Sequence, residues 1–77
     1  MKLRIVSPEK VVFDGEVSSV IVPGTVGQFE ILEGHAPIIS SLEHGVVSYT
    51  SDARHELQVK GGFVSVQRNQ VNVCVEV

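Results

Sequence analysis

Hydrophobic and polar residues alternate along much of the chain, most regularly at its C-terminal end. In residues 70–77 a valine occupies every second position, and polar or small residues occupy the positions between. This period of two is that of a strand with one buried face. Residues 63–67 supply a partner strand, and Arg68-Asn69 join the two, because asparagine tolerates the positive φ of tight hairpin turns. The sequence therefore predicts a β-hairpin over residues 63–77.

Turn residues divide the rest of the chain into further short apolar segments. No stretch places apolar residues at i, i+3, i+4 and i+7 behind a cap, so we predict no helix longer than one turn. Several short strands in one small chain predict an all-β fold, a two-sheet sandwich or flattened barrel that hides its strand edges. We expect a single domain over residues 1–77. The further segments predicted as strands are 2–6, 11–13, 16–22, 28–32, 46–50 and 55–60.

Charge and composition narrow the class of function. The net charge is −3, and the six Lys and Arg residues are scattered, so we expect no nucleic-acid partner. No apolar run approaches the roughly 20 residues of a membrane helix, and the start MKLRIVSPEK leaves no room for a signal-peptide core. We therefore expect a soluble chain without membrane insertion, made in the cytoplasm. A lone cysteine, Cys74, excludes an internal disulfide, and small domains without one often depend on a partner.

Histidines are the first candidates for metal chemistry. His35, His44 and His55 match neither the i, i+4 pair of a helical zinc site nor a Cys-x-x-Cys framework. A convergent site of three histidines stays open, since spacing alone does not decide it. We expect instead hydrogen-bonded or solvated histidines and no metal.

The sequence also contains few residues or motifs that indicate catalysis. The Gly-x-Ser-x-Gly elbow of serine hydrolases is absent, and Cys74 alternates with valines as an inert small side chain would. Glu30 and Glu33 near His35 can be drawn as an acid–base group, but carboxylates on an exposed loop are usually plain surface. We expect no catalytic residue and no cofactor.

Two segments point to binding instead. Gly24-Thr25-Val26-Gly27 lacks the spacing and lysine of a phosphate loop, yet Pro23, Val26 and Phe29 place apolar side chains near its tip, which is typical of a docking surface. Gly34-His35-Ala36-Pro37 is a stiff corner, because the proline holds Ala36 extended. Beyond it Ile38 and Ile39 point to opposite faces if extended, one toward the core and one toward a neighbour.

The run GQFEILEGHAPIISSLEHGVV resembles the G-H-A-P segment of the epsilon subunit of the F-type ATP synthase. The flanking segments IVSPE, VFDGEV, VIVPG and GGFVSV resemble successive strands of the same family, so that the resemblance covers essentially all 77 residues. It implies a β-sandwich of about ten strands in two sheets, the N-terminal domain of epsilon. It also implies a non-catalytic rotor subunit that links the gamma subunit to the c-ring and couples proton-driven rotation to ATP synthesis.

The resemblance also assigns surfaces and a location. The surface toward gamma would include Ser7, His35 and Ser40, so that His35 is a positioning residue rather than a catalyst. The complex would lie peripherally on the cytoplasmic face of a bacterial inner membrane. The loop that faces the c-ring would comprise Pro23, Gly24, Thr25, Val26, Gly27, Gln28, Phe29 and Glu30.

The sequence departs from the family pattern at two points. Glu30 and Glu33 replace the usual glycine and proline, which adds acid beside the expected ring surface. The family usually continues into a two-helix domain, which binds ATP in some members, and no such helices follow Val77 in this sequence. We therefore expect neither ATP binding nor helix-mediated inhibition. The alternatives are a free-standing β-sandwich binding module and, last, a small hydrolase or metalloenzyme built on His35 and Glu33.

Overall fold

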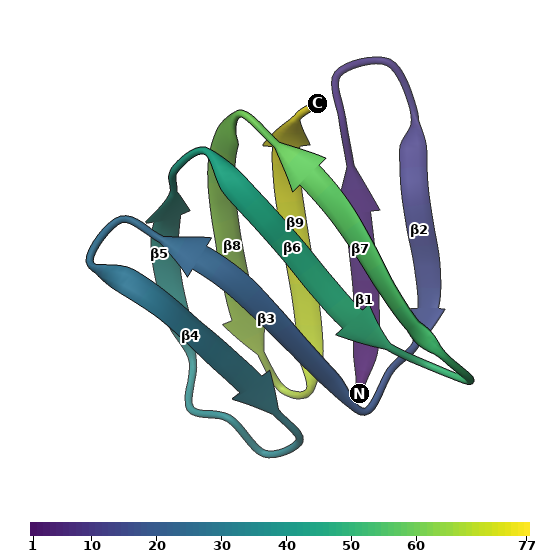
Figure 1. The fold of residues 1–77 in the computed structure, drawn as a ribbon. Helices are drawn as coiled ribbons and strands as arrows, with labels where there is room; N and C mark the ends of the chain where they lie inside the picture. The colour runs from purple at the N-terminus through teal and green to yellow at the C-terminus, as the bar shows by residue number, and fades with distance from the viewer.

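The computed structural model describes residues 1–77 and consists of strands and turns (Figure 1). The alternation of β-branched and polar residues is the reason, since such residues pack well on a pleated surface. There is no helix, and thus no helical segment that could span a membrane. The nine strands are β1 Lys2–Val6, β2 Val11–Glu16, β3 Ser19–Gly24, β4 Gly27–Leu32, β5 Ile38–Leu42, β6 Gly45–Thr50, β7 Arg54–Val59, β8 Gly61–Gln67 and β9 Gln70–Glu76.

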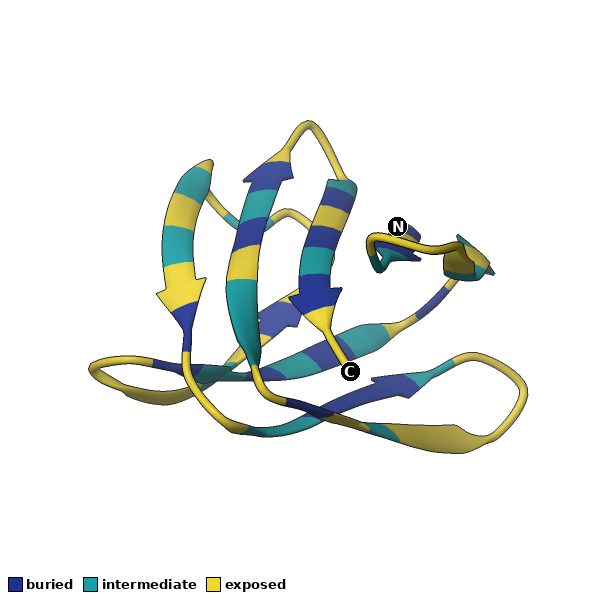
Figure 2. Ribbon diagram, turned by 90° about the horizontal axis from the view of Figure 1, so that it is seen from above, coloured by how far each residue is buried: buried dark blue, intermediate teal, exposed yellow.

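The strands form two layers. One layer has the order β2-β1-β9-β8-β5, and the other contains β4, β3, β6 and β7. Only the β1–β9 pair is parallel, and a single pairing of Gly24 with Leu42 joins β3 to β5 and makes the two layers one curled sheet. Figure 2 shows the two layers from above. The predicted all-β sandwich or flattened barrel is thus confirmed, with nine strands where about ten were expected.

The core lies between the layers and is built from every second residue of the strands. The banding of buried and exposed residues along the strands is visible in Figure 2. Fully burying one such aliphatic side chain stabilises the fold by about 1.5–3 kcal/mol, so this small domain depends on nearly all of them. Side chains that are fully buried come from both layers: Leu3, Ile5, Val20, Val22, Ile31, Val47, Val64, Val71 and Val73.

The C-terminal hairpin forms as the alternation predicts. Strands β8 and β9 pair from Gly61 opposite Glu76 to Gln67 opposite Gln70. The two turn residues, Arg68 and Asn69, both have positive φ angles, 52° and 58°. Two consecutive residues with positive φ are the mark of a type I′ turn, whose twist matches that of the strands.

Most predicted strands have ends that differ by one or two residues from those observed, and three differences are larger. Strand β2 continues through Asp14-Gly15 to Glu16, because these residues pair with Lys2, Leu3 and Arg4 of β1. The Asp14 carboxylate also forms an ion pair with Lys2 Nζ at 3.3 Å. Strand β3 begins three residues later than expected, at Ser19. Strand β5 was not predicted, because hydrophobic and polar residues do not alternate in Ile-Ile-Ser-Ser-Leu. This segment is a strand because it pairs with β8.

Candidate interaction surfaces

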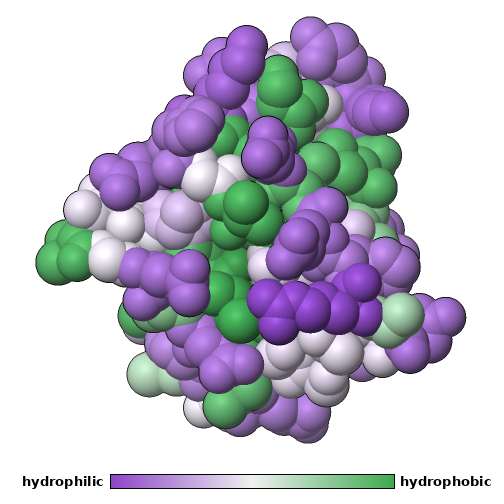
Figure 3. All heavy atoms as spheres, in the orientation of Figure 1, coloured by the Kyte–Doolittle hydropathy of each residue, from purple (hydrophilic) through white to green (hydrophobic).

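The tip of the β3–β4 hairpin carries one bare apolar side chain. Gly24 pairs with Gly27, which closes a two-residue turn at Thr25 and Val26. Val26 is fully exposed, whereas the ring of Phe29 folds back onto Gly24 and packs against the core. Figure 3 shows apolar atoms protruding at this hairpin end, at the left of the view. Of the three apolar residues expected at the tip, Val26 is fully exposed, and Pro23 and Phe29 are half-buried.

The tip is fastened to the connection between β5 and β6. The Thr25 amide donates to the Ser41 carbonyl at 3.2 Å, and the Glu43 amide donates to the Pro23 carbonyl at 2.9 Å. Glu43 and His44, both exposed, therefore lie beside the tip at the same end of the sandwich. Sequence reasoning missed them, because nothing in a single sequence shows which connections share one end of a sandwich.

The Gly34-His35-Ala36-Pro37 corner is held by several hydrogen bonds. The Gly34 amide donates to Oδ1 of Asn69 in the β8–β9 turn at 2.8 Å, and the His35 amide donates to the Leu32 carbonyl at 3.1 Å. Gly34 has a φ of 82°, in the left-handed region that favours glycine. Beyond the corner, Ile38 packs against the core and Ile39 is 82% exposed, as the alternation predicts.

Ser7, His35 and Ser40 lie on one layer but not in one cluster. Ser7 follows β1, and Ser40 lies on β5, with β9 and β8 between those strands. Three strand spacings put β1 and β5 about 14 Å apart. His35 lies in the connection before β5, at the opposite end of the layer from Ser7 (Figure 1). Ser40 shares the side of β5 that Ile38 and Leu42 turn toward the core, so the three residues form neither a pocket nor a single exposed face.

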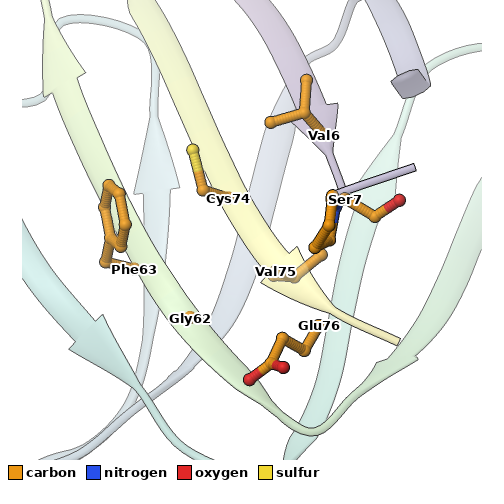
Figure 4. Close-up of a pocket in the computed structure, with 8 residues that line it drawn as sticks. Val6, Ser7, Gly62, Phe63, Cys74, Val75 and Glu76 are labelled. Carbon is orange, nitrogen blue, oxygen red and sulfur yellow. The ribbon is translucent and has the colours of Figure 1, made fainter. Parts of the chain in front are cut away.

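The outer face of this layer carries an apolar row. The register aligns Val11, Val6, Cys74 and Phe63 side by side across β2, β1, β9 and β8. Phe63 is 51% exposed and Val11 is 47% exposed. A hollow of about 400 Å³ lies at this row. Figure 4 shows residues that line it, from β8, β9 and the end of β1 with the residue that follows. A second hollow, of about 540 Å³, lies beside Ile39 and Pro37.

The titratable side chains do not assemble into a reaction centre. His35 Nδ1 lies 2.7 Å from the Ala36 carbonyl, and His55 stacks on Tyr49 with ring centroids 5.3 Å apart. His44 lies in the β5–β6 connection, so the histidines occupy three separate places. No group of three or more His, Cys, Asp or Glu residues is arranged to hold a metal ion.

One carboxyl has a shifted pKa. The Ser51 hydroxyl donates to Oδ1 of Asp52 at 3.0 Å, and this hydrogen bond is the main cause that lowers the Asp52 pKa. A hydrogen bond to the charged form stabilises it, and the His55 ring, 3.7 Å away, acts in the same direction. The Asp52 side chain is exposed in the turn between β6 and β7.

The fold defines a small β-sandwich with exposed apolar side chains at the β3–β4 tip and on the outer face of one layer. A family model described as "ATP synthase, Delta/Epsilon chain, beta-sandwich domain" matches residues 1–77. The chain belongs to this family, and the resemblance to the epsilon subunit is confirmed.

Named relatives agree with this assignment. An ATP synthase epsilon chain from Chlorobium limicola is 43% identical over 77 residues, covering 97% of this chain and 88% of the relative. One from Leptospira interrogans is 38% identical, and this chain spans 61% of its length.

Solved structures agree in fold. A chain in the mitochondrial ATP synthase of Euglena gracilis matches 95% of this chain with a TM-score of 0.88 at 18% identity, over 48% of its own length. A chain in the central stalk and c-ring structure of the Tetrahymena thermophila enzyme matches 99% of this chain with a TM-score of 0.83 at 18% identity, over 63% of its own length. At such identities the likeness concerns the fold alone.

Proposed function

We propose that this chain is a non-catalytic rotor subunit of an F-type ATP synthase. It links the gamma subunit to the c-ring in the membrane, so that proton-driven rotation reaches the catalytic head. The observation that carries the proposal is the family match over residues 1–77, together with epsilon chains as its relatives. The complex lies on the cytoplasmic face of a bacterial inner membrane, and the chain takes part peripherally.

Residues Pro23 to Glu30 form the surface toward the c-ring. The support is the fully exposed Val26 at the end of a hairpin that backbone hydrogen bonds fix to the β5–β6 connection. A fixed apolar tip costs little ordering entropy on docking. Glu43 and His44 extend the same surface with polar groups, which suits polar loops of a membrane protein.

The outer face of β2, β1, β9, β8 and β5 forms the surface toward gamma, with Ser7 and His35 at its ends. Ser40 lies on the other side of the edge strand β5, the side that Ile38 and Leu42 turn toward the core, so its contact with gamma would have to be made at the edge of the sheet. The support is the half-exposed apolar row that includes Phe63 and Val11, and the exposed Ile39 beyond it. An apolar centre with a polar surround is the usual make-up of a protein interface. The hydrogen-bonded corner keeps His35 at the start of β5, so its role is positioning.

Purification of the complex tests the proposal. The tagged chain is expressed in its source organism, and the retained proteins are identified after membranes are solubilised in a mild detergent. Recovery of both the gamma and the c-ring subunits is the expected result. If the tagged chain incorporates into stable complexes that contain neither subunit, the rotor function is wrong, and a free-standing binding module becomes the working interpretation.

A further inference from the structure

One side chain ties the Gly34–Pro37 corner to a different hairpin. Oδ1 of Asn69, in the β8–β9 turn, accepts a hydrogen bond from the Gly34 amide at 2.8 Å. His35 makes the other two hydrogen bonds of the corner, both with residues no more than three positions away in the chain. The corner and the β8–β9 turn lie at the same end of the domain (Figure 1). The position of the corner relative to β8 and β9 therefore depends on Asn69.

The backbone of Asn69 is itself fixed in the fold. Its φ of 58° lies in the left-handed region, and together with Arg68 it forms the turn between β8 and β9. Its carbonyl accepts a hydrogen bond from the Lys2 amide at 2.9 Å. Glycine adopts this backbone conformation as readily as asparagine does. A glycine at position 69 would therefore keep the turn and lack only the side-chain oxygen.

The hydrogen bond closes a ring of chain at the end of the β5–β8 pair. The two segments are paired at Ile38 and Val66, separate beyond this pair, and meet again where Gly34 donates to Asn69. Pro37 lies between these two fixed points and is exposed. The hollow of about 540 Å³ is lined by residues of both segments: Pro37, Ile38, Ile39, Ser65, Val66 and Gln67. The rim of this hollow at Pro37 therefore depends on the bond between Gly34 and Asn69.

We propose that Asn69 is a positioning residue for the gamma surface, because its side chain holds the Gly34–Pro37 corner in the shape that gamma binds. The inference rests on the proposed function, since it takes gamma as the partner. The corner places His35 and the rim of the hollow at the end of this surface, whereas the apolar row around Phe63 lies on β8 and does not depend on it. A corner that is already ordered spares gamma the entropy cost of ordering it on binding.

Amide hydrogen exchange in the isolated domain tests the structural part of the inference. Asn69→Gly removes the acceptor, so the Gly34 amide is expected to exchange its hydrogen about three- to tenfold faster, the factor that loss of one net hydrogen bond gives. The Lys2 amide, which donates to the carbonyl of residue 69, should exchange at an unchanged rate. Asn69→Asp keeps an oxygen acceptor and should restore the slow exchange of Gly34. Unchanged exchange of Gly34 in the glycine variant would overturn the inference.

Arg68→Gly is the matched control. Arg68 has a φ of 52° in the same turn, so its replacement adds similar backbone freedom to the unfolded chain and leaves the bond between Asn69 and Gly34 in place. Thermal melting by circular dichroism establishes that each variant is folded at the temperature of the measurements. Exchange of Gly34 that is as fast in Arg68→Gly as in Asn69→Gly would show that the turn, and not the Asn69 side chain, holds the corner.

Titration calorimetry with isolated gamma tests the role in binding. The unchanged, Asn69→Asp and Arg68→Gly chains are expected to bind gamma with equal affinity, and Asn69→Gly about three- to tenfold more weakly. Equal affinity of the unchanged and Asn69→Gly chains would overturn this inference and leave the proposed gamma surface standing. The inference is also wrong if Asn69→Asp fails to restore the affinity, since the oxygen would then not be the cause. No binding by the unchanged chain would overturn the gamma surface as well.

Discussion

Pro23 lies directly on Gly45, so closely that a methyl group at position 45 would be 2.8 Å from the Cβ of Pro23. The Glu43 amide donates to the Pro23 carbonyl at 2.9 Å, which fixes the two segments at the same point. This contact aligns the β3–β4 tip with the β5–β6 connection, and one glycine makes it possible.

Gly45→Ala is expected to destabilise the fold by about 1–3 kcal/mol, because an overpacked contact forces its neighbours apart. The free energy of unfolding in urea measures the effect. Gly61→Ala is the matched control, since the nearest atom to its new methyl group is the Leu42 carbonyl oxygen at 3.5 Å, an ordinary contact. Equal free energies of unfolding for the two variants would show that the contact between Pro23 and position 45 does not require glycine there.

Gly62→Ala is expected to be much more damaging, by at least about 3 kcal/mol. Gly62 has a φ of 148°, and its new methyl group would meet the backbone of β9 at Cys74 and Val75. A paired strand cannot move away as a flexible side chain can. Dispersion of the amide signals in an NMR spectrum checks whether the β8–β9 hairpin still forms, and a native-like spectrum would contradict the expectation.

Val26→Arg is expected to reduce proton-driven ATP synthesis while the isolated domain stays as stable as before. Val26 is fully exposed, so its replacement should leave the free energy of unfolding unchanged. Docking on the c-ring would remove water from an unpaired arginine charge, at a cost of several kcal/mol. Gln58→Arg, at an exposed position on β7, is the control for added charge. Normal synthesis by a complex that contains the Val26 variant would remove this tip from the ring surface.

Phe63→Glu is expected to weaken binding of the gamma subunit at least about tenfold, because the change places a charge in the apolar row of the outer face. Titration calorimetry with isolated gamma measures the affinity. Gln58→Glu adds the same charge outside the row and should bind as the unchanged chain does. Equal affinity of the two variants would locate gamma elsewhere on the domain.

Asp52 should titrate below the ordinary value of 3.8 for its pKa, because the Ser51 hydroxyl stabilises the carboxylate. A lowered pKa in the folded chain stabilises the fold above the unfolded pKa, and this contribution is lost as the pH falls through the folded pKa. The exposed position makes the energy small. Ser51→Ala should move the NMR titration midpoint of Asp52 upward, and an unmoved midpoint would exclude Ser51 as the cause.

The sequence predicted best where one local pattern decides the structure. The valines of β9 and the Arg68-Asn69 turn are such patterns, since alternation and turn geometry involve near neighbours. Strand β5 escaped prediction because its order comes from pairing with β8 rather than from its own residues. Asp14-Gly15 has the composition of a turn, but its pairing with Leu3 and Arg4 of β1 makes it part of a strand.

The candidate surfaces show the same division. The exposure of Val26 and the placement of Ile38 and Ile39 on opposite faces follow from local pattern, and the structure bears out both. That Glu43 lies beside Pro23, and that Glu33 reaches Met1, depends on contacts between distant segments. A single sequence contains no direct signal of either contact, because no local spacing encodes them.

We propose that this domain mechanically couples the c-ring to gamma. The measurement that decides this role is proton-driven ATP synthesis in vesicles that contain the otherwise complete enzyme, reconstituted with and without this chain. Synthesis is expected to require the chain and to return when the purified chain is added. Equal rates of coupled synthesis with and without the chain would show that it does not couple the c-ring to gamma.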